Sequence, residues 1–214
     1  MAGKKTPDYM MSASRLPALL GLSKYQTPND ELQFSINAAK GVPREDKQNE
    51  AMAWGDRLES MILRETAKRL ELFELSTEFD SAFFHDTLPL ACSLDGYAHG
   101  RGQKIRTDTD AGIIVVGQDE IMLDGYGVLE AKLTAVPPEE MPALYRGPVQ
   151  LQAQMDIMQA KWGAVCVLYQ GVELRIFLFA PDPVVQETIR QKVFEFDAKL
   201  TQYHINGEVE QYQE

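Results

Sequence analysis

Gly127-Val-Leu-Glu-Ala-Lys-Leu133 is a mainly apolar stretch that predicts a strand carrying two charged residues. Side chains alternate across a strand, so Glu130 and Lys132 share one face, ~7 Å apart along it, and the apolar side chains share the other. Burying a carboxylate and an ammonium is unfavourable unless each has a partner. The pair therefore indicates either a functional site or an edge strand with a solvated polar face.

A second acidic residue ends a short apolar stretch further upstream. In Leu90-Ala-Cys-Ser-Leu-Asp-Gly96 the alternate apolar residues share one face, so Asp95 projects from the other face, where the glycine turns the chain. An Asp-Gly pair after a strand is also typical of an ordinary turn. The residues alone leave both interpretations open.

A third acid, Glu59, lies in a long helix predicted from about Asn49 to Leu70. It stands at the border of the apolar stripe rather than on the solvated face. An acid at such a border is often simply exposed, so Glu59 is a weak signal alone. The stripe recurs at helical spacing through Ala51, Trp54, Leu58, Met61, Ile62 and Leu70.

The remaining segments alternate between helical and extended patterns. A short helix is expected from Ser12 or Ser14 to Leu20, and a second one begins near Thr27 or Asn29. The order of helices, strands, helix, strands and helix predicts an α/β (α+β) fold with a central mixed β-sheet flanked by helices. The other expected elements are strands within 72–98, at 113–116, 163–169 and 174–179, and helices at 147–160 and 183–203.

The length of 214 residues and the 44% hydrophobic content fit a single domain with one sizeable core. We expect one domain over residues 1–214. Within it, residues 1–10 are expected to be flexible, 99–126 to form a hairpin insertion with polar ends, and 208–214 to fray. Trp54 and Trp162 are expected in the core.

The formal net charge of −11 argues against a uniformly basic nucleic-acid-binding surface. Either the partner is not a nucleic acid, or acids gather around a metal while basic residues line a local track. A small basic run, Arg101, Lys104 and Arg106, fits a solvated loop and a DNA-backbone contact about equally. Two cysteines and no spanning apolar stretch predict a reduced, cytoplasmic protein without a membrane helix.

Glu59, Asp95, Glu130 and Lys132 together supply what phosphodiester hydrolysis requires. Magnesium prefers oxygen ligands, commonly one or two carboxylates together with water and substrate phosphate. Hydrolysis needs charge neutralised at the phosphate and an activated water, and a metal can do both. A lysine beside the metal can orient that water or help to deprotonate it.

Five segments between residues 12 and 158 carry a resemblance to a known family of nucleases. They are Ser12-Ala-Ser-Arg with Gly21-Leu-Ser-Lys-Tyr, Ala53-Trp-Gly-Asp-Arg-Leu-Glu59, Ala91-Cys-Ser-Leu-Asp95-Gly, Leu129-Glu-Ala-Lys132, and Gln150-Leu-Gln-Ala-Gln-Met in a glutamine-rich helix. The order of acids and lysine resembles the PD-(D/E)xK motif, which implies a restriction-endonuclease-like core. In these segments the chain is similar to the lambda-exonuclease/YqaJ family of viral recombination exonucleases.

The resemblance also implies roles for individual residues. Asp95 and Glu130 would be the main metal ligands, with the carbonyl of Ala131 as a further ligand and Glu59 supporting a second metal or its water shell. Lys132 would position the attacking water, and Gln150 would hold that lysine or the nucleophile. The implied contacts to DNA and its 5′ phosphate are Ser12, Ser14, Arg15 and Gln154.

The activity implied by the resemblance is a Mg²⁺-dependent 5′-to-3′ exonuclease, with Mn²⁺ as a substitute ion. It would act on ends of linear double-stranded DNA and leave 3′ single-stranded tails for phage-type recombination by strand annealing. The resemblance further implies a ring-shaped homotrimer and a single-strand annealing protein as partner. A ring would let basic residues face the DNA while acids face solvent or metal.

Some features depart from the family pattern. The segment between Asp95 and Glu130 is longer than a short hairpin requires, Leu94 replaces the motif's proline, and Lys4 or Lys5 would have to stand in for an arginine before Ser12. These departures leave the exact phosphate pocket open. Three alternatives to the exonuclease also stay open: a restriction-type endonuclease on the same core, a non-catalytic module that binds DNA ends, and a structural protein whose acids are ordinary surface residues.

Overall fold

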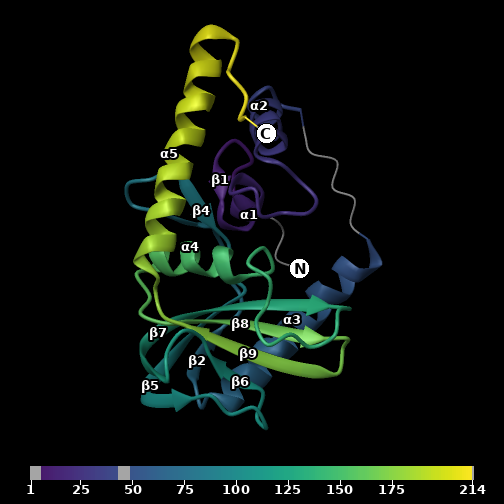
Figure 1. Ribbon diagram of the computed structural model, residues 1–214, viewed down its shortest axis with the longest axis vertical. Helices are drawn as coiled ribbons and strands as arrows, with labels where there is room; N and C mark the ends of the chain where they lie inside the picture. Colours follow the sequence, from purple (N-terminus) through teal and green to yellow (C-terminus); the bar gives the residue numbers. More distant parts are fainter. Residues whose placement is uncertain (1–5, 43–48, 214) are drawn as a thin grey trace.

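A computed structural model describes residues 6–42 and 49–213 of the chain. The described residues form two β-sheets, with helices on both faces of the larger one (Figure 1). Residues 1–5 of the expected flexible N-terminus, Lys4 and Lys5 among them, lie outside the described residues, as does Glu214. No helix in the described ranges is both long enough and apolar enough to cross a membrane.

The larger sheet contains six strands and is mixed, as the order of elements predicted. Its centre is β7, a strand of 15 residues that pairs antiparallel with β5 and parallel with β8. The β8–β9 pair is antiparallel and the β9–β6 pair is parallel. In spatial order the strands are β2 (Phe73–Ser76), β5 (Gly96–Arg106), β7 (Glu120–Thr134), β8 (Gly163–Tyr169), β9 (Glu173–Phe179) and β6 (Ile113–Val115).

The smaller sheet joins the N-terminal segment to the stretch that leads to Asp95. Its order is β1 (Met11–Ser12), β4 (Leu90–Cys92) and β3 (Phe83–Phe84), with Ser12 paired to Ala91. The helical segment expected to be capped by Ser12 or Ser14 begins after Ser12, which is its N-cap residue, although the Ser12 side chain makes no capping hydrogen bond. Ser12 is extended and belongs to a strand, and a 3-10 turn, η1 (Ala13–Arg15), precedes α1 (Leu16–Leu19).

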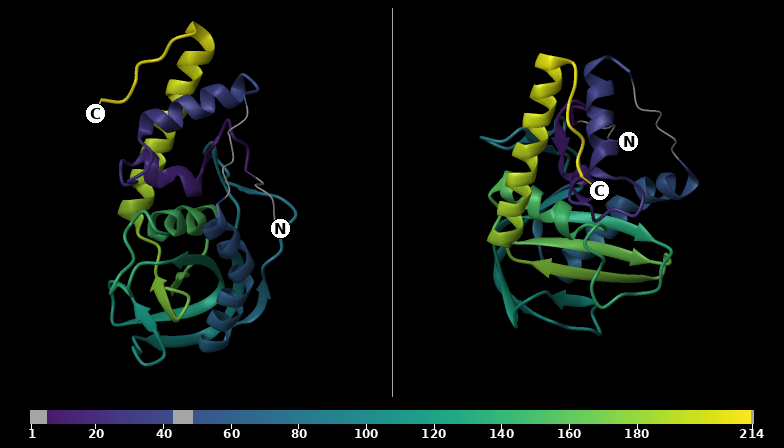
Figure 2. Two further views of the ribbon diagram at one scale, coloured as in Figure 1. Left: turned by 90° about the vertical axis from the view of Figure 1, so that its right-hand side faces the viewer. Right: turned by 45° about the horizontal axis from the view of Figure 1, so that its top comes forward.

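The longer helices are divided between the two faces of the large sheet. In Figure 1, α4 lies across one face and α5 rises from it, while α3 crosses the opposite face; Figure 2 shows the same layers from two other directions. A buried cluster on the α4 side includes Val128, Val165 and Phe177, and a second cluster on the α3 side includes Leu129 and Trp162. The longer helices are α2 (Pro28–Ala39), α3 (Glu50–Arg69), α4 (Pro148–Met158) and α5 (Pro183–Asn206).

The N-terminal half of helix α3 is largely exposed, and its C-terminal half packs against the large sheet. The Asn49 side chain caps its first turn by accepting from the N–H of Met52 at 2.9 Å. Its C-terminal half buries Ile62 and Leu63 against the sheet, whereas Trp54 in the N-terminal half is 47% exposed. Trp54 is thus not a core residue as expected, while the prediction for Trp162 is confirmed. The first turns of α3 and the end of β7 line the same cavity.

Residues 99–126 include the expected extended hairpin, but the chain at its end also joins the core sheet. β5 and β7 pair as a long hairpin out to Arg106 and Glu120, but the chain between them adds β6 to the far edge of the same sheet. β6 joins the sheet because its apolar residues Ile113 and Val115 are buried against β9. This segment is an integral part of the sheet.

The C-terminal tail is held rather than frayed over its described part. The Asn29 side chain donates to the carbonyl of Tyr212 at 3.0 Å and accepts from the Tyr212 N–H at 2.7 Å. Lys199 of α5 donates to the carbonyl of Glu210 at 2.8 Å. Because apolar Val209 and Tyr212 also pack on the core, the tail fastens α2 to α5 despite its acidic composition.

Candidate active site

Strands β5 and β7 bring Asp95 and Glu130 to one end of the large sheet. Gly96 is paired with Leu129, so Asp95, which precedes β5, lies beside the Glu130–Ala131 stretch of β7. The N–H of Ala131 donates to Asp95 Oδ2 at 2.9 Å. A Cβ on Gly96 would lie 3.2 Å from Leu129 Cβ and as close to a side chain of α3, so the glycine lets the strand approach its neighbours.

Glu130 and Lys132 are in direct contact, on the face of β7 that alternation predicted. Lys132 Nζ donates to Glu130 Oε1 at 2.5 Å and to Gln150 Oε1 at 3.3 Å. Glu130 is 1% exposed and the Lys132 side chain 28% exposed. The charged pair is therefore buried on the carboxylate side and open on the ammonium side, and the edge-strand interpretation does not apply.

Gln154 lies one helical turn beyond Gln150 on α4 and is fully buried. Its Nε2 donates to Glu130 Oε2 at 2.7 Å and to the carbonyl of Ser93 at 3.2 Å. The expected contact between Gln154 and DNA does not fit this position, because the side chain points into the sheet and not to solvent. Gln154 instead holds the central carboxylate.

Glu59 completes the group from the opposite side, on the face of α3 that meets β7. It is half-buried, and its pKa is raised, first by burial and then by the negative charges of Glu130 and Asp56. Glu59, at the border of the apolar stripe of α3, therefore lies at the candidate site.

Burial, and then mutual repulsion of the carboxylates, shifts the pKa values of this group. The pKa of Asp95 is raised well above its ordinary value, chiefly by burial and then by the charge of Glu130. Burial alone would lower the pKa of Lys132, but Glu130 and Asp95 outweigh burial and the pKa is raised. One ammonium among three carboxyl groups leaves the site short of positive charge.

The group opens into a cavity of about 980 Å³ that lies between α3, the end of β7 and the N-terminal segment. Glu59, Asp95, Glu130, Lys132 and Gln150 line one part of it. Ser12, Ser14 and Arg15 line another part. All of these residues were expected from the sequence to belong to the site, and the fold places them on the wall of one cavity.

The two serines and Arg15 have different environments. Ser12 is buried, Ser14 is exposed, and their hydroxyl oxygens lie 3.3 Å apart. Arg15 is 5% exposed; its Nε donates to Glu31 at 2.5 Å and its Nη2 donates to Ser35 at 2.8 Å. We therefore drop Arg15 from the expected phosphate ligands, because its guanidinium is committed to a buried ion pair.

The model of the YqaJ-like viral recombinase domain matches residues 5–161 of this chain, which include every residue of the site. The chain belongs to the YqaJ-like viral recombinase family. The resemblance inferred from the five sequence segments is thereby confirmed. A comparison with curated proteins finds no match.

Solved structures share the fold of this YqaJ-like chain at low sequence identity. An alkaline exonuclease from Laribacter hongkongensis is 16% identical, with a TM-score of 0.65 over 92% of this chain and 90% of its own. A complex of that enzyme with dAMP matches equally well. A phage-related exonuclease from Haemophilus somnus 129PT is 10% identical, with a TM-score of 0.63 over 93% of this chain and 96% of its own. The predicted fold class is confirmed.

The donor set of the YqaJ-like site suits a hard cation. Asp95, Glu130 and Glu59 supply carboxylate oxygens, and Ala131, whose carbonyl the family resemblance implies as a further ligand, lines the same cavity. Across the described residues, no three His, Cys, Asp or Glu side chains are arranged to hold an ion by themselves. Mg²⁺ usually keeps water and substrate phosphate among its ligands, so a pair of carboxylates open to a cavity fits it.

Sequence reasoning missed several residues that line the cavity from the first turns of α3. Asn49, Met52 and Gly55 are among them. Met52 and Gly55 lie seven and four residues before Glu59, which is helical spacing on one face. Counting back from Glu59 along the helix could have found them.

The basic run of β5 lies within the hairpin and pairs with its own partners. Lys104 and Arg106 both contact Glu120 at 3.0 Å, and the Arg101 guanidinium stands 4.9 Å from the centre of the Phe73 ring. These contacts favour support of the β5–β7 pair over a contact with the DNA backbone.

Proposed function

We propose that this YqaJ-like chain is a nuclease formed by one domain, which hydrolyses linear double-stranded DNA from its 5′ ends and leaves 3′ single-stranded tails. Mg²⁺ would be its ion, with Mn²⁺ as a substitute. One observation carries the proposal: Asp95, Glu130 and Lys132 are brought into mutual contact or interaction on the wall of one cavity. The fold shared with an alkaline exonuclease supports it.

In the proposed mechanism the metal would be held by Asp95 and Glu130, with the carbonyl of Ala131 and with Glu59 behind it. Bound there, the ion would supply the positive charge that a phosphodiester needs before water can attack it. The two carboxylates fix its place, and the cavity beside them admits the phosphate. The raised pKa values of Asp95 and Glu59 indicate a site that gains from a cation.

Lys132 acts in this scheme as a charged hydrogen-bond donor. Glu130 and Asp95 outweigh burial and raise its pKa, so without metal the side chain is protonated near neutral pH. As an ammonium it orients the attacking water and faces the charge that develops on the phosphate. Gln150 accepts from the same nitrogen and limits its movement.

The far part of the cavity is the proposed seat of the strand end. Ser12 and Ser14 offer hydroxyl groups there, and the exposed Ser14 is the more accessible. Hydroxyl donors of this kind suit a terminal 5′ phosphate. We also propose a homotrimeric ring and an annealing protein as partner in phage-type recombination, which would take place in the bacterial cytoplasm.

The test follows each strand of a linear duplex labelled at its 3′ end or internally, in Mg²⁺, with 5′-phosphate or 5′-hydroxyl ends. We expect shortening from 5′ ends, preference for the phosphate, and no cutting of covalently closed circles. Lys132→Met should lose cleavage by about 100-fold or more while still binding duplex ends. Lys104→Met, which removes an exposed lysine far along β5, is the matched control and should cleave normally.

Three outcomes would contradict the proposal. Cutting of closed circles would indicate a restriction-type endonuclease. End binding by the wild-type protein without hydrolysis in Mg²⁺ or Mn²⁺ would indicate a non-catalytic end-binding module. Full cleavage by Lys132→Met would remove the proposed role of the lysine.

A further inference from the structure

The inner face of α4 contains a buried amide that the proposed mechanism does not use. Gln154 is fully buried, and its Nε2 lies 2.7 Å from Glu130 Oε2 and 3.2 Å from the carbonyl oxygen of Ser93. Both partners can only accept. Gln154 therefore serves as a double donor at the base of the site.

The orientation of this amide is imposed by its neighbours. Gln154 Oε1 is buried and finds no hydrogen-bond partner among the described residues. Turning the amide over would bring that oxygen against a carboxylate and a carbonyl, which is worse than leaving it unpaired. The amide of Gln154 thus keeps its contact with Glu130 even though its own oxygen stays unpaired. We infer that this contact is the main role of the residue.

The consequence falls on Glu130, whose two carboxylate oxygens are held by different groups. Oε2 is held by Gln154 and Oε1 by Lys132. Without the amide, the carboxylate could rotate and offer both oxygens to the ammonium, and that closer ion pair would compete with a cation. Groups that hold a ligand by its second oxygen commonly set the affinity of a metal site.

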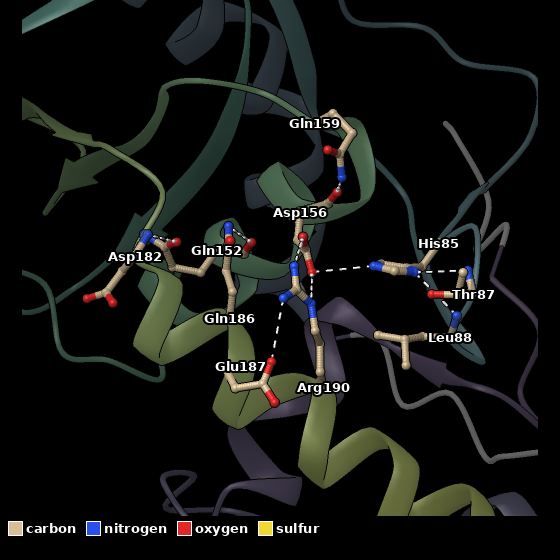
Figure 3. A network of polar contacts seen from close by, with 10 residues as sticks. All are labelled: His85, Thr87, Leu88, Gln152, Asp156, Gln159, Asp182, Gln186, Glu187 and Arg190. Atoms are coloured by element: carbon tan, nitrogen blue, oxygen red, sulfur yellow. Dashed lines mark hydrogen bonds and ion pairs between the residues drawn. The ribbon is translucent and has the colours of Figure 1, made fainter.

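Helix α4 itself is clamped from its other side, as Figure 3 shows. Arg190 of α5 donates to both oxygens of Asp156, at 3.0 and 2.6 Å, and His85 Nε2 lies 3.4 Å from the same carboxylate. Gln152 donates to the carbonyl of Ala180 at 3.0 Å and accepts from the N–H of Asp182 at 2.9 Å. These contacts tie α4 to α5 and to the connection that precedes α5.

We propose that Gln154 is a positioning residue that holds Glu130 through Oε2 and keeps the carboxylate oriented to bind a divalent cation. This inference rests on the proposed metal-dependent function. It assigns Gln154 a role through Glu130, with no contact to DNA.

Gln152 provides a matched control on the same helix. It is also a buried glutamine with two backbone partners, but those partners lie in the connection to α5, away from the site. Gln154→Met and Gln152→Met each remove one buried amide at nearly constant side-chain volume. A general loss of packing or hydrogen bonding should affect both variants, whereas loss of carboxylate positioning should affect only the first.

The experiment titrates Mn²⁺ into the full-length, DNA-free protein and records its binding by electron paramagnetic resonance. Gln154→Met should bind Mn²⁺ about 10-fold or more weakly than wild type, and Gln152→Met should bind as wild type does. In cleavage assays Gln154→Met should lose kcat with little change in KM for DNA. If the methionine variant does not fold, Gln154→Asn replaces it, because an amide one methylene shorter cannot reach Glu130.

Two results would overturn the inference. One is a folded Gln154 variant with wild-type Mn²⁺ affinity, and the other is an equal loss in Gln152→Met. If wild type binds Mn²⁺ and cleaves DNA while Gln154→Met equals it, only this inference fails. If wild type neither binds Mn²⁺ nor cleaves, the proposed function fails and the inference fails with it.

Discussion

Asp95 is the residue at which function and stability are expected to oppose each other. Its pKa is raised by burial and by Glu130, so the folded protein holds its proton more tightly than the unfolded chain does. The stability that Asp95 contributes is therefore present at low pH and is lost as pH rises through the folded pKa. At neutral pH, without metal, the raised pKa of Asp95 makes the folded state less stable than it is at low pH.

The prediction concerns Asp95→Asn, which keeps an acceptor for the N–H of Ala131 and removes the charge. Without metal at neutral pH this variant should be more stable than wild type, by about 1 kcal/mol. The gain should vanish below about pH 3.9, where the aspartate is protonated in both states. Denaturant unfolding across pH measures it, and an Asp95→Asn variant less stable than wild type at neutral pH would refute the electrostatic account.

Arg15 is expected to support the fold and not to bind phosphate. Arg15→Ala removes the guanidinium from a buried ion pair with Glu31, so stability should fall by about 3–5 kcal/mol. Arg64→Ala, at an exposed position on α3, is the control and should change stability by less than about 0.5 kcal/mol. Thermal unfolding distinguishes the roles: an unchanged Tm for Arg15→Ala together with a lost preference for 5′ phosphate would restore Arg15 as a ligand.

At the scale of elements, the junction of β7 and β8 depends on the close approach of the Gly127 backbone to the Trp162 ring. A Cβ at Gly127 would stand 2.2 Å from Cε2 of the buried Trp162 ring. Gly127→Ala should therefore destabilise the protein by about 1–3 kcal/mol, because the ring or the strand must move. Gly55→Ala, in open space on α3, should instead raise stability by about 0.5–1 kcal/mol. Equal unfolding midpoints for the two variants would contradict this packing.

Local patterns predicted those elements whose burial is decided within the segment itself. Alternation along 127–133 placed Glu130 and Lys132 on one face of β7, and helical spacing placed Glu59 at the edge of the α3 stripe. Gln150 and Gln154 are four residues apart and therefore share one face of α4, but this spacing does not show what each side chain contacts. Gln154 contacts Glu130 of the sheet, whereas Gln150 lines the cavity.

Contacts between distant segments account for what the sequence did not reveal. Arg15 finds Glu31 sixteen residues away, and the tail finds Asn29 183 residues away. β6 leaves its own hairpin to pair with β9. Each depends on tertiary packing, which periodicity within one segment does not contain.

For the whole molecule, a net charge of −11 has to be reconciled with a polyanionic substrate. The proposed ring would do so by directing basic groups toward the DNA and acidic groups toward solvent. Sedimentation equilibrium should then give the mass of three chains at micromolar concentration. A monomer that still degrades duplex ends would remove the ring from the account while leaving the chemistry in place.

We propose that a divalent cation binds between the carboxyl groups of Asp95 and Glu130, beside Lys132. Anomalous diffraction from a crystal soaked in Mn²⁺ would locate that ion. We expect an anomalous peak within coordination distance of both carboxylates, about 2.0–2.3 Å from the nearest oxygens, and no such peak in Asp95→Asn. Manganese bound only elsewhere in wild type, or carboxylates too far apart to share one ion, would contradict it.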